Sequence, residues 1–255
     1  MHAVLLAAGV GRRLTDITGG GPKSLLPFGE LSLLERHVRQ LAAAGIHRLT
    51  IVVGCEAMQI EQALAAIVSD AAPEMTVTTE HNARFREGSA LSVLTAREAL
   101  TSGDDVLLMD ADVLYDQRML ACLLASESAD ALLIDRNVDA DDAEPVKICL
   151  ADGRIVAFDK QLPAELSYDV IGESVGFFRL SSATAASLIE ACEQVSEADA
   201  ESPYEAGLQY VMRARGSRFA AEDVTGLPWI EIDYPEDVDR AMDQVLPQLE
   251  SLHDG

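Results

Sequence analysis

The sequence has little positive charge and no long apolar run. Against 43 acidic residues it carries only 19 lysines and arginines, which gives a formal net charge of −24. Nucleic acid would meet like charge over most of such a surface, so the composition argues against it as a partner. No apolar run is long enough to span a bilayer and no basic leader is present, so we expect a cytoplasmic protein that binds no membrane.

Cysteine and histidine are also scarce. The four cysteines have neither the Cys-x-x-Cys spacing of a zinc site nor the density of a disulfide framework. The five histidines do not cluster at ligand spacing. We therefore expect buried thiols rather than a zinc or disulfide scaffold. With 255 residues, 49% of them hydrophobic, the chain can still bury a sizeable core.

In the first half of the chain, short apolar runs alternate with segments that have apolar residues at helical spacing. This order is typical of βα units. We expect an α/β fold, Rossmann-like, with a mostly parallel mixed sheet flanked by helices. The expected strands are 4–7, 49–53, 75–79, 106–109 and 131–134, and the expected helices are 33–44, 56–67, 90–100 and 117–124.

The pattern changes after Arg136. An acidic linker is expected there, followed by a hairpin with an Asp-Gly turn and then by further short strands and helices. No clean boundary is visible, so we expect one domain over 1–255, with halves of about 1–136 and 137–255. The expected segments are the linker 139–144, strands 146–150, 154–158, 174–180, 218–221 and 229–232, and helices 183–192, 204–213 and from Pro235.

The first apolar strand leads into a glycine turn flanked by cations. Gly9 and Gly11 are followed by Arg12 and Arg13, and Lys23 stands after a further glycine run. Glycines let backbone N–H groups approach phosphate oxygens, and the cations can neutralise phosphate charge. This local reversal of charge predicts a triphosphate site, with a solvated basic turn as the alternative. The dinucleotide fingerprint and the Walker P-loop ending are both absent.

Acidic residues follow two other apolar strands. Asp110 and Asp112 end the strand 106–109, and Glu231 and Asp233 lie in the strand segment near the C-terminus. Ligands of open α/β sheets bind beyond the carboxyl ends of the strands. Mg²⁺ bridging phosphates prefers one or two carboxylates plus water. We therefore predict Asp112 and Asp233 as Mg²⁺ ligands, with turn or helix capping as the alternative.

Together these motifs are similar to those of the nucleotidyltransferase family, which makes activated sugars and alcohols from an NTP and a phosphomonoester. The shared patterns are Ala-Ala-Gly-x-Gly-x-Arg-Leu over 7–14 with a downstream Pro-Lys, Asp-Ala-Asp at 110–112, and Glu-Ile-Asp-x-Pro-Glu-Asp at 231–237. They span nearly the whole chain. The resemblance implies the nucleotide-diphospho-sugar transferase type of fold with a small acceptor-side β/α lobe, Mg²⁺ as cofactor, and release of pyrophosphate.

The resemblance also implies roles for individual residues. Lys23 matches the lysine that stabilises charge in the transition state, and Arg13 matches a triphosphate contact. Lys160 matches a second lysine that grips the acceptor phosphate. Arg12 stands where the family more often has Ser or Thr. Nucleotide contacts are implied for Leu6, Ala7, Ala8, Gly9, Gly11, Arg12 and Asp110.

The segment 82–92 is similar to one in cytidylyltransferases that act on phosphocholine, inositol phosphate or aminoethylphosphonate. On that comparison Asn82, Gly88 and Ser89 line the pyrimidine pocket, although Ser89 also suits a helix N-cap. CTP is therefore the expected nucleotide, with a small phosphate or phosphonate as the acceptor. The alternatives are a sugar-1-phosphate nucleotidyltransferase that uses UTP, dTTP or GTP and a non-catalytic nucleotide-binding regulatory relative.

The second half offers scarce aromatic and acidic residues for an acceptor pocket: Tyr168, Glu173, Tyr204, Glu205 and Trp229. Aromatic rings with a carboxylate would suit a cationic amine, through cation–π contact and ion pairing. Core packing or surface charge is the alternative for each of them. The oligomeric state stays open, a homodimer included.

Overall fold

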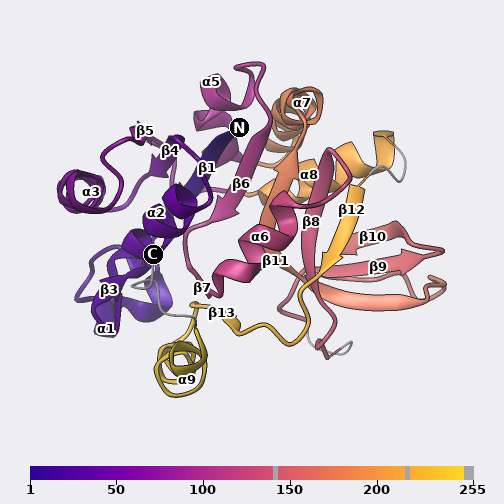
Figure 1. The fold of residues 1–255 in the computed structure, drawn as a ribbon. Helices are drawn as coiled ribbons and strands as arrows, with labels where there is room; N and C mark the ends of the chain where they lie inside the picture. Colours follow the sequence, from indigo (N-terminus) through magenta and orange to yellow (C-terminus); the bar gives the residue numbers. More distant parts are fainter. Residues whose placement is uncertain (140–142, 216–218, 250–255) are drawn as a thin grey trace.

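The computed structural model describes residues 1–139, 143–215 and 219–249. Within these ranges a nine-stranded sheet has helices on both of its faces (Figure 1). The strand order is β10-β9-β11-β6-β1-β4-β5, with β8 beside β11 and β12 beside β8. The strands are β1 (His2–Ala7), β4 (Arg48–Val53), β5 (Thr76–His81), β6 (Val106–Asp110), β8 (Asp130–Asp135), β9 (Lys147–Ala151), β10 (Arg154–Asp159), β11 (Val170–Leu180) and β12 (Phe219–Asp223).

The strands β1, β4, β5 and β6 are parallel to one another, as the alternating pattern predicts. β1 lies between β4 and β6, with Leu5 opposite both Ile51 and Met109. β11 joins the other side of β6 in the antiparallel sense and carries the β9–β10 hairpin. The carboxyl ends of β1 and β6 consequently bring the glycine turn and Asp110 to one edge of the sheet, where ligands of such sheets bind.

Alternating side chains of the strands enter two separate cores. Leu5 packs with α2, α3 and α6 on one face, whereas Val4 packs with α4, α5, α7 and α8 on the other. The second core also contains Phe219, so both halves of the chain contribute to it. The helices are α1 (Thr15–Thr18), α2 (Leu33–Ala43), α3 (Ala57–Ala71), α4 (Ala90–Thr95), α5 (Arg97–Leu100), α6 (Gln117–Leu124), α7 (Ser182–Ala198), α8 (Tyr204–Arg215) and α9 (Pro235–Arg240).

A third, small core joins the two ends of the chain. Leu14 and Phe28 from the N-terminal segment pack there with Ile232 and Val245. Two short sheets flank it: β2 (Pro27–Phe28) pairs with β3 (Leu31–Ser32), and β7 (Val113–Tyr115) pairs with β13 (Trp229–Glu231). Short 3₁₀ turns cover Arg12–Leu14, Lys23–Leu25 and Leu246–Gln248, and a π-helical turn covers Ala241–Val245. This core holds the segment after β13 against the glycine turn.

The expected α/β architecture is confirmed, and several boundaries differ. The helix expected over 90–100 is divided at Ala96 into α4 and α5. Ser89 does not cap α4, because its Oγ accepts instead from the backbone N–H of Tyr204. The expected linker at 139–144 and strand at 218–221 fall partly outside the described residues. In the part that the structure covers, no helix is long and apolar enough to cross a bilayer.

We predict that Gly176→Ala destabilises the protein by about 2 kcal/mol more than Gly103→Ala does. Both glycines have left-handed backbone angles, with φ of +81° and +88°, so both substitutions add similar backbone strain. A Cβ at Gly176 would overlap Oδ2 of Asp110, whereas a Cβ at Gly103 meets nothing. Urea unfolding of both variants measures the difference. Equal losses of unfolding free energy in the two variants would contradict the prediction, because they would mean that the Asp110 side chain moves away at no cost.

Candidate active site

A basic pocket of about 310 Å³ lies where the glycine turn leaves β1. Four cations line it together with Gly11 and Asp233: Arg12, Arg13, Lys23 and Arg86. Gly11 has a φ of +59°, and a Cβ added to it would lie 3.6 Å from Cβ of Lys23. The turn therefore packs closely on the lysine. In a chain of such negative charge, four clustered cations make this pocket the natural place for an anionic ligand.

Lys23 lies between two carboxylates that come from distant parts of the chain. Its Nζ is 2.7 Å from Oδ2 of Asp112 and 2.7 Å from Oδ1 of Asp233. Burial by itself would lower the pKa of Lys23, but the two carboxylates hold that pKa well above its ordinary value. The ammonium group is thus fully charged at neutral pH.

A third carboxylate completes this cluster. One oxygen each of Asp112, Glu231 and Asp233 lie within 4.8 Å of one another. The pairing of β7 with β13 sets the geometry, because it places Glu231 opposite Val113 and lets the Ile232 N–H donate to the Asp112 carbonyl. Burial and the neighbouring carboxylates of Asp112 and Asp233 raise the pKa of Glu231 to about 8.

The cluster fits a hard divalent cation. All three donors are carboxylate oxygens, the ligand type that Mg²⁺, Ca²⁺ and Mn²⁺ prefer. Oδ1 of Asp112 is shielded from solvent and accepts no hydrogen bond from the described residues. A buried acceptor of this kind normally has a partner. A bound cation would supply one, so Asp112, Glu231 and Asp233 are the residues that could hold it.

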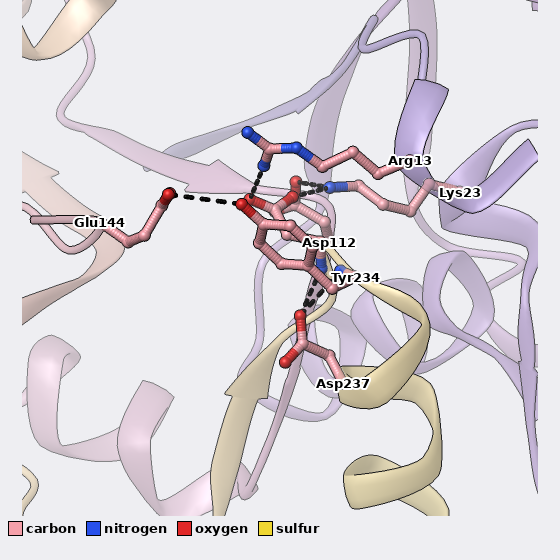
Figure 2. A network of polar contacts seen from close by, with 7 residues as sticks. Arg13, Lys23, Asp112, Glu144, Tyr234 and Asp237 are labelled. Carbon is pink, nitrogen blue, oxygen red and sulfur yellow. Dashed lines mark hydrogen bonds and ion pairs between the residues drawn. The ribbon is translucent and has the colours of Figure 1, made fainter. Parts of the chain in front are cut away.

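The segment after β13 is fixed by a polar network around Tyr234 (Figure 2). Oδ2 of Asp237 accepts hydrogen bonds from the backbone N–H groups of Asp233 and Tyr234, at 3.0 and 2.8 Å. The guanidinium of Arg13 lies 4.4 Å from the centre of the Tyr234 ring and forms an ion pair with Asp233. The Tyr234 hydroxyl donates to Glu144. The network therefore spans from the basic pocket to the opposite wall of the cleft.

Beyond the carboxylates the cleft continues as an outer acidic pocket of about 410 Å³. Asp233 borders both this pocket and the basic one. Acidic side chains outnumber basic ones in its lining, which comprises Asp135, Glu144, Glu173, Glu231, Asp233 and Asp237 with Lys160 and Arg240. The cleft therefore changes sign across the Lys23 cluster, from basic on the glycine-turn side to acidic on the other.

A family comparison agrees with this geometry. Residues 3–201 match the model of the MobA-like NTP transferase domain. The chain belongs to this NTP transferase family.

Two curated relatives of the chain are larger proteins. Over 99% of its length the chain is 32% identical to a bifunctional IPC transferase and DIPP synthase of Rubrobacter xylanophilus. The match covers 54% of that relative. Over its full length the chain is 27% identical to a CMP-5'-(3-aminopropyl)phosphonate synthase of Streptomyces rubellomurinus. The match covers 41% of that relative. The chain spans about half the length of these relatives.

A solved structure has the same fold. The inositol-1-phosphate CTP transferase of T. maritima superposes with a TM-score of 0.74 and 21% identity, over 98% of both chains. The similarity covers both the parallel half of the sheet and the antiparallel extension. The mixed sheet is therefore the NTP transferase architecture that the motifs predict.

The structure gathers the residues predicted for phosphate and metal contacts, namely Arg12, Arg13, Lys23, Asp112 and Asp233, around one cleft. Lys160 is exposed and lines the acidic part of that cleft. Leu6, Ala7, Ala8 and Gly9 lie where β1 ends, and the Ala8 carbonyl accepts from the N–H of Cys55. Ala7, Ala8 and Gly9 stay predicted contacts to base and ribose, and Leu6 stays a predicted nucleotide contact.

The three residues predicted for the pyrimidine pocket are engaged within the protein. Asn82 is buried, and its Nδ2 donates to Ser92 while its Oδ1 accepts from the Arg84 N–H. Gly88 packs so closely on the backbone of Ser202 that a Cβ would overlap it. Ser89 accepts from the N–H of Tyr204. They shape the 82–92 segment, and a direct contact to a base stays a prediction.

The residues predicted for the acceptor pocket are placed unequally. Tyr204 is buried, and its hydroxyl donates to Oδ2 of Asp110 at 2.7 Å. Trp229 lines the outer acidic pocket and donates from Nε1 to the buried Asp135. Tyr168 is 38% exposed and is not among the side chains that line the three parts of the cleft. The structure thus gives Tyr168 no support as an acceptor contact.

Sequence reasoning missed several residues of the cleft. Arg86 lines the basic pocket, and its signal was present in the 82–92 segment as a cation next to Phe85. Glu231 joins the carboxylate cluster although only Asp233 was predicted as a ligand from that strand segment. Glu144 and Tyr234 meet only in the folded chain, across 90 positions of sequence. No local pattern could have predicted that last contact.

We predict that Lys23→Met increases the affinity of the nucleotide-free protein for Mn²⁺ by about tenfold or more, equivalent to about 1.4 kcal/mol. The Lys23 ammonium lies against two oxygens of the carboxylate cluster and opposes an entering cation by like-charge repulsion. Electron paramagnetic resonance of free Mn²⁺ gives the affinity. Arg12→Met is the matched control, because Arg12 lines the same pocket without an ion pair to the cluster in the described residues. Unchanged or weaker Mn²⁺ binding by Lys23→Met would contradict the prediction.

Proposed function

We propose that the chain is an Mg²⁺-dependent cytidylyltransferase that joins CTP to a small phosphate or phosphonate and releases pyrophosphate. The observation that carries the proposal is the carboxylate cluster around Lys23, at the boundary between a basic and an acidic pocket. A nucleotide-consuming reaction also suits the cytoplasmic location that the sequence predicts. The relatives support the choice of CTP, since their names include CMP-phosphonate synthesis and transfer from CTP.

The reaction needs no nucleophile from the protein. An oxygen of the acceptor phosphate or phosphonate, already anionic at neutral pH, attacks the α-phosphorus of CTP. A new phosphorus–oxygen bond forms, the bond from the α-phosphorus to the bridging oxygen breaks, and pyrophosphate leaves with the electron pair. Catalysis of such a transfer depends on alignment and on neutralisation of negative charge.

The residues of the cleft divide this work. The backbone of the glycine turn and the side chains of Arg12, Arg13 and Arg86 are placed to bind the leaving phosphates. Lys23 can exchange its carboxylate partners for phosphate oxygens. Asp112, Glu231 and Asp233 would hold Mg²⁺, which supplies charge neutralisation at the phosphates when bound. Lys160, on the acceptor side, is placed to bind the acceptor phosphate.

The test is pyrophosphate release with CTP, UTP, dTTP and GTP, each paired with phosphonates, phosphocholine, inositol phosphate and sugar 1-phosphates. We expect turnover with CTP and a non-sugar acceptor. Preference for UTP, dTTP or GTP with a sugar 1-phosphate would favour the sugar nucleotidyltransferase alternative. Tight nucleotide binding without turnover on any acceptor would favour a regulatory relative.

We predict that Asp233→Asn lowers kcat with CTP by about 10²-fold or more, because it removes a charged donor from the metal cluster and a partner from Lys23. Asp239→Asn, an exposed substitution on α9, is the matched control and should keep full activity. Thermal melting confirms that both variants are folded. Equal turnover of the two variants would remove Asp233 from the proposed mechanism.

A further inference from the structure

An inner acidic pocket of about 80 Å³ opens from the outer one, beside Asp110. Its charged lining consists of Asp110, Glu144, Lys160, Glu173, Glu205 and Glu231. Lys160 and Glu231 border both pockets, so the inner one continues the cleft away from the basic side. It is therefore the part of the cleft that a group at the far end of the acceptor would reach.

Glu205 has a carboxyl oxygen in this pocket that lacks a hydrogen-bond donor. It lies in the first turn of α8 and is partly buried, and its Oε2 is shielded from solvent and accepts no hydrogen bond from the described residues. A buried carboxyl oxygen without a donor is costly, and such groups normally have partners. Burial raises the pKa of Glu205, while a hydrogen bond from its own backbone N–H and the charge of Lys160 act in the opposite direction.

Three other carboxylates of the pocket already have partners. Asp110 accepts from the Tyr204 hydroxyl, and Glu144 accepts from Tyr234. Glu173 also interacts elsewhere in the protein. Glu231 belongs to the carboxylate cluster around Lys23, so the buried acceptor that remains open in this pocket is Oε2 of Glu205, in surroundings rich in negative charge.

We propose that the inner pocket binds a primary ammonium group at the far end of the acceptor, with Glu205 as the residue that determines this specificity. The inference rests on the proposed function. An ammonium group supplies N–H donors to Oε2 and adds positive charge to a lining in which Lys160 faces five carboxylates. A hydroxyl of a neutral polyol would supply a donor without that charge. Among the described residues of the lining the only aromatic ring is Tyr204, which is buried and already donates to Asp110, so these residues form no aromatic cage for a quaternary ammonium.

The acceptor would then lie along the gradient of charge in the cleft. Its phosphonate or phosphate end faces Lys160 and the metal cluster, and its ammonium end faces Glu205. Lys160 borders both acidic pockets, which places it between these two ends. A short ω-aminoalkyl phosphonate has this distribution of charge.

The test compares 3-aminopropylphosphonate with its neutral counterpart 3-hydroxypropylphosphonate, with CTP as donor and pyrophosphate release as the signal. For the unaltered protein we expect kcat/KM to be at least about tenfold higher with the amine. Glu205→Gln keeps the shape of the side chain and removes its charge. It should raise KM for the amine about tenfold or more, with little change for the hydroxyl compound.

Glu190→Gln, on the exposed side of α7, is the matched control and should leave both compounds unaffected. The hydroxyl compound reports on folding and chemistry in the Glu205 variant itself. Equal use of both compounds by the unaltered protein, or equal losses on both in Glu205→Gln, would overturn the inference and leave the proposed function standing. No pyrophosphate release with any acceptor would overturn both.

Discussion

The Lys23 ammonium between Asp112 and Asp233 is the interaction on which the rest of the site depends. It joins the N-terminal turn to the end of β6 and to a segment more than two hundred residues later. Three carboxylates at the spacing of the cluster repel one another strongly when they are ionised. Without a cation the cluster would have to open or bind protons, so Lys23 maintains its geometry. A divalent ion would take over that task.

This compensation requires the two ends of the chain to be held together by packing, since an ion pair at a partly exposed site contributes little stability. The small core around Leu14, Phe28 and Ile232 provides that packing. Asp237 then fixes the backbone of the segment that carries Asp233. The carboxylate cluster is therefore positioned by apolar contacts and backbone hydrogen bonds, and its charges determine what it binds.

The sequence predicts the parallel half of the fold and the phosphate side of the site because both are written in local patterns. The strand–helix alternation and the glycine turn are each formed by residues that are close in sequence, and Asp112 and Asp233 each follow an apolar strand. The acceptor side could not be predicted in the same way. Glu144 and Tyr234, or Tyr204 and Asp110, come together only through β-sheet pairing and helix packing. Tyr168 is predicted as an acceptor contact because aromatic residues are scarce. The scarcity of a residue type does not show where the fold places it.

The reversal of charge along the cleft has a consequence for the direction of substrate binding. A triphosphate bound in reverse would place its terminal phosphates among Glu144, Glu205 and Glu231, where like charge opposes it. Bound the other way, these phosphates meet Arg12, Arg13 and Arg86. In the proposed reaction the acidic pockets would therefore contribute even before an acceptor enters, because they favour the orientation of the nucleotide in which its α-phosphorus faces the acceptor side. On these proposals, specificity for a cationic acceptor and orientation of the anionic nucleotide would both follow from the same distribution of carboxylates.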